Sequence, residues 1–116
     1  MKLEDAIAAH SAWKLRLRQF VDGRGDKLES KTVARDDACA LGQWLHGDGQ
    51  CHAARPEFAK LLKEHAQFHK TAGDVVRAIE MGNKSRAESL LASRGPFDLS
   101  SQATVDAILG LKRAAR

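Results

Sequence analysis

The 116-residue sequence has no tyrosine, only two prolines and two cysteines, and no long run of uncharged apolar residues. The longest such run covers residues 107–111, whereas a membrane-spanning helix needs about 20 apolar residues. Near the N-terminus, Glu4 and Asp5 stand where a secretory signal would have its apolar core. We therefore expect neither membrane insertion nor export.

The sequence also lacks a concentrated basic patch. Its 19 Lys and Arg residues outnumber its 15 Asp and Glu residues, but acids are interleaved with them, and the one basic cluster lies within residues 112–116. Proteins that bind nucleic acids usually gather Lys and Arg on one stripe. Nucleic acid is therefore not an expected partner.

Several patterns that mark common catalytic sites are missing as well. There is no Gly-rich phosphate loop, no Ser-His-Asp order and no pair of inward carboxylates. No Asp or Glu is followed by a His three residues later, so the carboxylate di-iron site of helical bundles is disfavoured. What the sequence does contain is five histidines alongside the two cysteines.

The length and the apolar periodicity predict one all-α domain over residues 1–116. A chain of this length forms one domain and buries roughly two-thirds of its unfolded surface. Apolar side chains recur every three or four residues, which is typical of helices, and no alternating strand pattern competes. The expected helices cover residues 3–22, 36–45, 56–81 and 84–93 and a last segment from about residue 100, with a loop at 26–35. We expect an antiparallel four-helix-type bundle with an additional short helix that carries Cys39.

Three histidines interrupt these apolar stripes. His10 lies on the stripe of the first helix, and His65 and His69 lie on that of the long helix. A single buried histidine is usually a hydrogen-bonded core residue. Residues four apart leave the same helix face, however, and His65 and His69 form a pair of the kind that often holds zinc. Three inward histidines on two helices favour a metal site.

Cys39 is the obvious fourth ligand, because it lies in a short amphipathic segment and is expected to point inward. The alternative is that it acts as a small buried apolar residue. A thiolate with three imidazoles forms a closed tetrahedral set suited to Zn²⁺ and unsuited to calcium or magnesium. Asp36 or Asp37 would then either accept a proton from a ligand histidine or simply cap the short helix.

A competing ligand set consists of His46, Cys51 and His52 in a Gly-rich segment. Its spacing with Cys39 matches no common zinc ribbon or finger, so we interpret these three as exposed loop residues. A disulfide between Cys39 and Cys51 is conceivable, but a reducing cytosol disfavours it.

Three motifs, in this order, resemble the chemoreceptor zinc-binding (CZB) domain family over about residues 3–112. The motifs are His10-x-x-Trp13-Lys14, Cys39-x-Leu41-Gly42-x-Trp44-Leu45-x-Gly47 and His65-x-x-x-His69 with Phe68 between. The resemblance implies one zinc ion held by His10, Cys39, His65 and His69, the set already reached from the stripes. It also implies that Trp13, Trp44 and Phe68 pack around the site and that Gly42 permits a close helix approach.

The resemblance further implies a bacterial, cytoplasmic sensory domain that acts as a homodimer. Such domains are mostly fused to chemoreceptor signalling modules or to GGDEF diguanylate cyclases, and some stand alone. They sense zinc availability or oxidants such as hypochlorous acid through the zinc-thiolate. Two alternatives stay open: a structural zinc-stabilised interaction module, and a zinc enzyme. The enzyme is the weaker of these two, since four protein ligands leave no open position for water.

Overall fold

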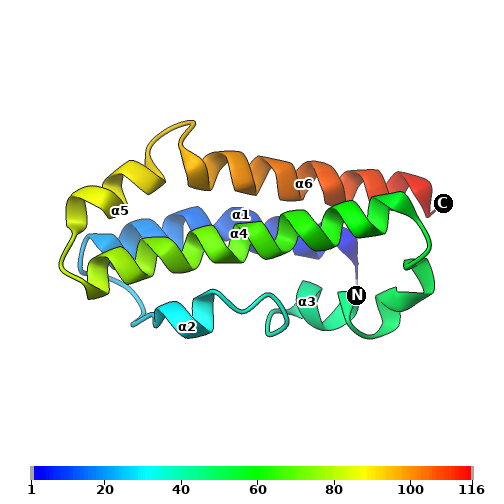
Figure 1. The fold of residues 1–116 in the computed structure, drawn as a ribbon, viewed down its shortest axis with the longest axis horizontal. Coiled ribbons are helices and arrows are strands. Elements are labelled where there is room, and N and C mark those ends of the chain that lie inside the picture. The colour runs from blue at the N-terminus through cyan, green and yellow to red at the C-terminus, as the bar shows by residue number, and fades with distance from the viewer. Residues whose placement is uncertain (1, 116) are drawn as a thin grey trace.

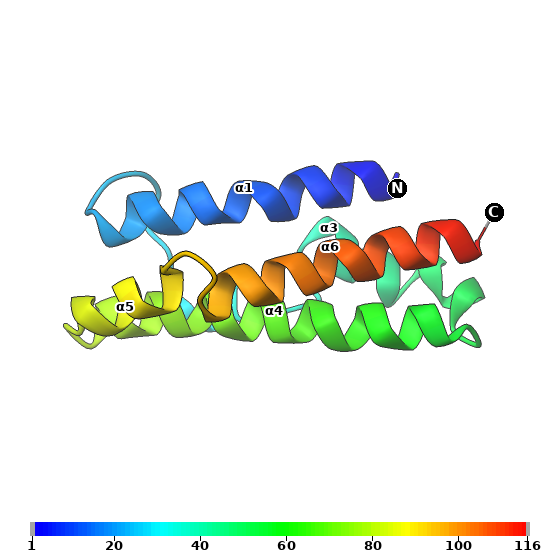
Figure 2. The ribbon, with the colours of Figure 1, turned by 90° about the horizontal axis from the view of Figure 1, so that it is seen from above.

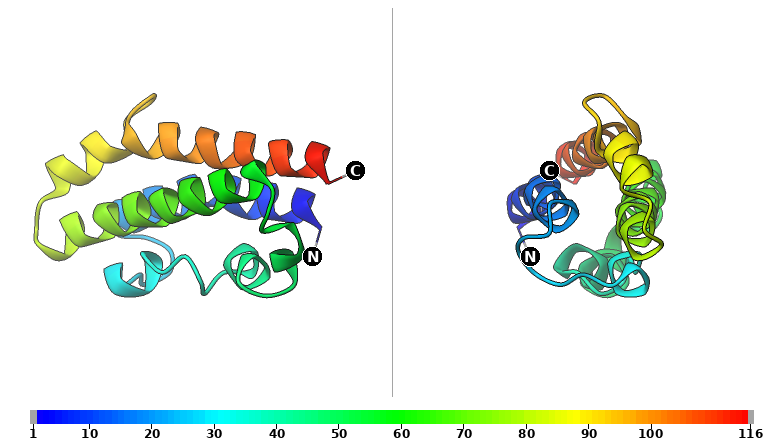
Figure 3. Two further views of the ribbon diagram at one scale, coloured as in Figure 1. Left: turned by 45° about the vertical axis from the view of Figure 1, so that its right-hand side comes forward. Right: turned by 90° about the vertical axis from the view of Figure 1, so that its left-hand side faces the viewer.

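The computed structural model describes residues 2–115. They form a bundle of four antiparallel segments, which we call legs. Three legs are the long helices α1 (Leu3–Val21), α4 (Pro56–Glu80) and α6 (Pro96–Ala114). The fourth is broken into α2 (Ser30–Val33) and α3 (Ala40–Leu45). In Figures 1 and 2, α1 and α4 run in one direction and the other two legs in the opposite direction. The legs surround a common interior when viewed along the bundle (Figure 3). The described residues contain no strand, and the all-α prediction is confirmed.

Two short helical segments connect the legs. The 3₁₀ helix η1 (Asp48–His52) joins α3 to α4, and α5 (Lys84–Leu91) joins α4 to α6. Pro56 occupies the first turn of α4, where its missing N–H costs nothing. Gly82 follows α4 with φ +74°, a conformation that glycine adopts readily. No helix within residues 2–115 combines the length and the apolarity needed to cross a membrane.

The fourth leg differs from the sequence prediction. Residues 26–35 were expected to form a loop, yet they contain α2, and the helix expected at 36–45 begins only at Ala40. The Glu80 carboxylate explains α2, because it accepts hydrogen bonds from the Ser30 amide (3.0 Å) and hydroxyl (2.6 Å). Such a cap from a residue 50 positions away leaves no local pattern. The last helix begins at Pro96 rather than near residue 100, since proline is preorganised for the first turn.

The interior contains two apolar clusters, one in each half of the bundle. The α5-end cluster is built mainly from the second half of α1, from the middle and C-terminal parts of α4, and from α5. The termini-end cluster is built mainly from the first turns of α1 and α4, from α3, and from the end of α6. Buried members of the two clusters include, respectively, Leu17, Phe68, Val76 and Leu91, and Ala6, Leu41, Leu61 and Ile108.

Gly42 lets α3 pack directly on the preceding chain. A methyl group on Gly42 would lie 2.8 Å from the carbonyl carbon of Asp36 and 2.9 Å from Cα of Asp37. Both neighbours are backbone atoms, which have little room to give way. The close approach expected at Gly42 is therefore present, but the partner is the chain at residues 36–37 rather than another helix.

We predict that Gly42→Ala lowers the free energy of unfolding by about 1–3 kcal/mol, because the methyl group must displace backbone. Gly110 in α6 is the matched control, since a methyl group there meets nothing within 4 Å. Gly110→Ala should stabilise the protein by about 0.5–1 kcal/mol through helix propensity. Urea unfolding followed by circular dichroism measures both changes, and equal stabilities of the two variants would contradict the packing at Gly42.

Candidate metal centre

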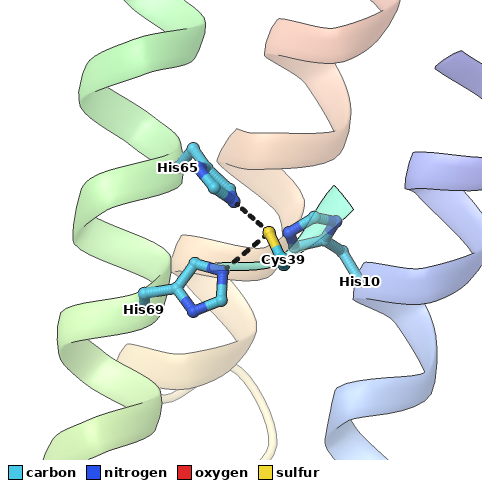
Figure 4. A group of neighbouring side chains, drawn as sticks. All are labelled: His10, Cys39, His65 and His69. Atoms are coloured by element: carbon cyan, nitrogen blue, oxygen red, sulfur yellow. Dashed lines mark hydrogen bonds between the residues drawn. The ribbon is translucent and has the colours of Figure 1, made fainter. Parts of the chain in front are cut away.

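Four side chains from three legs of the bundle converge between the two apolar clusters. Their potential ligand atoms all lie within 4.8 Å of one another, and Figure 4 shows the rings and the sulfur turned toward a common point. We call this group the His–Cys cluster; its members are His10, Cys39, His65 and His69. The structure thus brings together all four residues predicted from the sequence.

Helix geometry explains how the three imidazoles meet. His65 and His69 lie one turn apart on the inward face of α4, with ring centroids 4.6 Å apart. His10 reaches them from α1, and its ring centroid lies 5.0 Å from that of His65. All three side chains are only 1–2% exposed. The apolar periodicity that places these positions in the core also aims their rings at one another.

Cys39 reaches the cluster from the break in the fourth leg. It is the residue before α3, with an extended backbone (φ −77°, ψ 165°), and its Sγ accepts a hydrogen bond from the Gly42 amide at 3.3 Å. The sulfur lies 3.3 Å from His65 Nε2 and 3.6 Å from His69 Nε2. The thiol therefore caps α3 and faces the imidazoles at the same time.

Backbone carbonyls fix the tautomers of two imidazoles. His10 Nδ1 is 2.8 Å from the Ala6 carbonyl oxygen, and His69 Nδ1 is 2.9 Å from that of Val33. Because a carbonyl only accepts, Nδ1–H is the donor in both cases. Each Nε2 then carries a lone pair that points into the cluster. Carbonyl partners of this kind commonly orient metal-binding histidines.

His10 Nε2 is buried and has no hydrogen-bond partner within residues 2–115. A buried acceptor without a partner costs about 1–3 kcal/mol. Every other buried polar side-chain atom in this part of the chain has a partner. A metal ion at the centre of the cluster would use this orphaned lone pair.

The donor set and its spacing fit zinc. Ligands at about 2.0–2.3 Å from a tetrahedral ion lie about 3.3–3.8 Å from one another. The two sulfur–nitrogen distances already fall close to this value. Imidazole nitrogens and thiolate sulfur are ligands that zinc takes in tetrahedral sites, and the oxygen ligands that calcium and magnesium require are missing from the cluster.

Burial keeps the imidazoles neutral. It lowers the pKa of His10 and His69, and it lowers the pKa of His65 to about 3, with further repulsion from the neighbouring histidines. Neutral imidazole is the form that binds metals. Burial also raises the pKa of the Cys39 thiol, so without a cation nearby the sulfur keeps its proton.

The competing set predicted to lie in a loop does not form a site. His46 and Cys51 are exposed, and His52 lies against Trp44 with ring centroids 5.9 Å apart. Within the part of the chain that the structure describes, these three residues do not gather into a metal-sized group. Both cysteines are free thiols, so no disulfide joins Cys39 to Cys51.

The orienting partners of the histidines were missed at the sequence level. Neither Asp36 nor Asp37 hydrogen-bonds a cluster histidine; Asp37 pairs with Arg35 at 3.1 Å, and the Ala6 and Val33 carbonyls take that role. A backbone carbonyl is present at every residue, so no residue type could have signalled it. The i, i−4 relation of Ala6 to His10 within α1 is the one hint available.

Comparison with known proteins identifies one family. The model of the chemoreceptor zinc-binding domain matches residues 10–76. This span covers more than half of the chain and includes all four residues of the His–Cys cluster. No curated protein and no solved structure matches the chain.

We predict that acid lowers the free energy of unfolding of the metal-free protein in the pH range where histidine side chains titrate. The three cluster histidines have folded pKa values below the unfolded value of 6.5, so below that pH the unfolded chain binds more protons. Stability is full above pH 6.5 and falls as the pH decreases toward the folded pKa values, by up to about 1.4 kcal/mol per pH unit for each histidine. Urea unfolding after chelation, from pH 7.5 to about 5, measures the slope.

Two glutamine variants distinguish the contribution of the cluster histidines to this slope from that of the other histidines. His65→Gln should reduce the slope by roughly 1 kcal/mol per pH unit, since glutamine takes up no proton. His46→Gln, at an exposed position outside the cluster, should reduce the slope far less than His65→Gln. The same loss of slope in both variants would show that the buried imidazoles do not cause it.

Proposed function

Because the chain belongs to the chemoreceptor zinc-binding domain family, we propose that it is a regulatory domain whose His–Cys cluster binds one zinc ion. The observation that carries the proposal is the orphaned Nε2 of His10, buried beside three further donor atoms. Hydrogen bonding within the chain satisfies neighbouring polar groups but leaves this lone pair aimed at the centre of the cluster. When bound, zinc supplies the positive charge that keeps the Cys39 thiol deprotonated.

The ligands come from α1, α4 and the segment before α3, which lie far apart in sequence. Metal affinity is therefore linked to the free energy that holds these segments together. The segment around Cys39 has the weakest attachment of its own, since α3 has six residues and α2 has four. We propose that this segment loosens first when the metal leaves, and that its position reports zinc availability.

The exposure of Cys39 favours a second input, oxidation. Cys39 is partly exposed, whereas the three histidines are only 1–2% exposed. A thiolate attacks hypochlorous acid to give a sulfenic acid and chloride (Cys–S⁻ + HOCl → Cys–SOH + Cl⁻), so sulfur loses two electrons and chlorine gains them. The sulfenic acid is a poorer donor, and the segment that holds Cys39 would shift.

The response needs an output. We propose a chemoreceptor-type or GGDEF-type module, fused or separate, that acts together with a homodimer of this domain in the bacterial cytoplasm. A structural zinc module would bind the same ion in the same cluster but would show no response to oxidants.

The zinc proposal predicts one ion per chain in the purified protein, measured by elemental analysis. Alanine at any cluster position should weaken zinc binding by more than tenfold, since loss of an orienting partner alone costs about 10–100-fold. Competition with a chromogenic chelator gives the affinity, and circular dichroism confirms that each variant keeps its helices.

His46→Ala and Cys51→Ala are the controls, because they replace the exposed His and Cys outside the cluster. Both should retain one zinc with parental affinity. Zinc retained in the cluster variants, or lost in the two controls, would place the ion elsewhere and contradict the proposal.

The oxidant proposal predicts that stoichiometric hypochlorous acid releases zinc from a Cys51→Ser protein, which has Cys39 as its one thiol. A zinc-sensitive dye measures the release of zinc. Mass spectrometry should show a sulfenic adduct at Cys39 in the same samples. Adding Cys39→Ser to this background should abolish the adduct and the oxidant-dependent release. If zinc stays bound after Cys39 is oxidised, the domain is a structural zinc module.

A further inference from the structure

A pocket of about 560 Å³ opens beside the His–Cys cluster, between α1, the chain that follows it and α2. Its volume lies in the range of small-molecule sites. Cys39 and His69 form part of its wall, so it reaches the cluster itself. The right-hand view of Figure 3 shows the segment from α1 to α2 crossing this side of the bundle.

The charged residues of the pocket are mostly basic. Arg16, Lys27 and Arg35 line it, against one acid, Glu29. Arg35 is engaged by Asp37 at 3.1 Å. Among residues 2–115, Arg16 and Lys27 form no ion pair, and Arg16 lies over the Trp13 ring at 4.0 Å. Two cations are therefore available to a ligand.

The remaining wall is largely apolar. Trp13, Leu28, Val33 and Ala38 line the pocket together with the basic residues and Cys39. An aromatic ring and aliphatic side chains accept an apolar ligand body, and free cations accept a carboxylate. We propose that this pocket binds a small organic anion with an apolar body, such as an aromatic carboxylate, in contact with Cys39.

This site goes beyond zinc binding and does not depend on it, because the pocket is formed by the protein chain alone. A ligand there would cover Cys39, which is partly exposed. Occupancy would consequently limit the access of solutes to the thiol. The pocket gives the domain a further input, besides zinc and oxidation, that acts on the same residue as oxidation.

Trp13 offers a direct probe. The chain has two tryptophans, and Trp44→Phe leaves Trp13, in the pocket wall, as the only one. Benzoate is the test ligand and benzamide its uncharged counterpart. Titration of the Trp44→Phe protein with benzoate should change the Trp13 emission in a saturable manner, and benzamide should bind at least several-fold more weakly.

Lys27→Ala tests the charge, with Lys63→Ala as the control. Lys27 lines the pocket, whereas Lys63 is an exposed lysine of α4 that does not. Losing one exposed charge partner should weaken benzoate binding about two- to fivefold. Lys63→Ala should leave it unchanged, and benzamide binding should not respond to either variant.

Labelling of the thiol locates the ligand. In a Cys51→Ser protein, benzoate at saturation should slow the reaction of Cys39 with the neutral reagent iodoacetamide, and benzamide at the same concentration should slow it less. The experiment is run on protein of measured zinc content and again after the zinc has been removed by chelation. A failure of zinc binding can then be distinguished from a failure of anion binding. Failure of benzoate to saturate, equal binding of benzamide, an unchanged affinity in Lys27→Ala, or unaltered labelling would each overturn the proposal.

Discussion

The burial of three imidazoles in one layer, beside a partly exposed cysteine, is the constraint on which the rest of this bundle depends. The layer separates two apolar clusters, and its three histidines are only 1–2% exposed. Two Nδ1 atoms are satisfied by carbonyls, but the inward nitrogens face one another, and one of them has no partner. Such a layer weakens an apolar core unless an ion joins its donors. The bundle therefore carries a cost at its centre that zinc would offset.

The broken fourth leg follows from this constraint. A continuous helix opposite α1 and α4 would hold its side chains at fixed angles, whereas the residue before α3 has an extended backbone and turns its sulfur inward. The break is itself anchored: Glu80 caps α2, Gly42 admits the chain at residues 36–37, and the Val33 carbonyl orients His69. Each anchor joins the Cys39 segment to α3 or α4. The hydrogen bond from His69 to the Val33 carbonyl therefore links the His–Cys cluster directly to α2.

The sequence predicted the parts of the site that rest on periodicity. His10, His65 and His69 occupy apolar stripes, and helix geometry converts that spacing into convergence. Cys39 was expected inside a helix, but the structure places it one residue before the start of α3, where the chain at residues 36–37 packs against Gly42 instead of continuing the helix. The capping of α2 by Glu80 and the carbonyl of Val33 depend on tertiary contacts between distant positions. Neither leaves a pattern in the residues themselves.

The four donor residues differ in exposure, and this difference determines which of them a solute can reach. The fold leaves the imidazoles, which are poorly reactive, only 1–2% exposed, and it places Cys39, whose sulfur is the donor most easily oxidised, partly exposed in the wall of the pocket. The pocket wall and the sulfur belong in part to the same chain between α1 and α3. Metal loss, oxidation and an anion in the pocket would then act on one weakly attached segment, while α4 and α6 retain their own packing. A domain built this way can respond locally without losing the bundle.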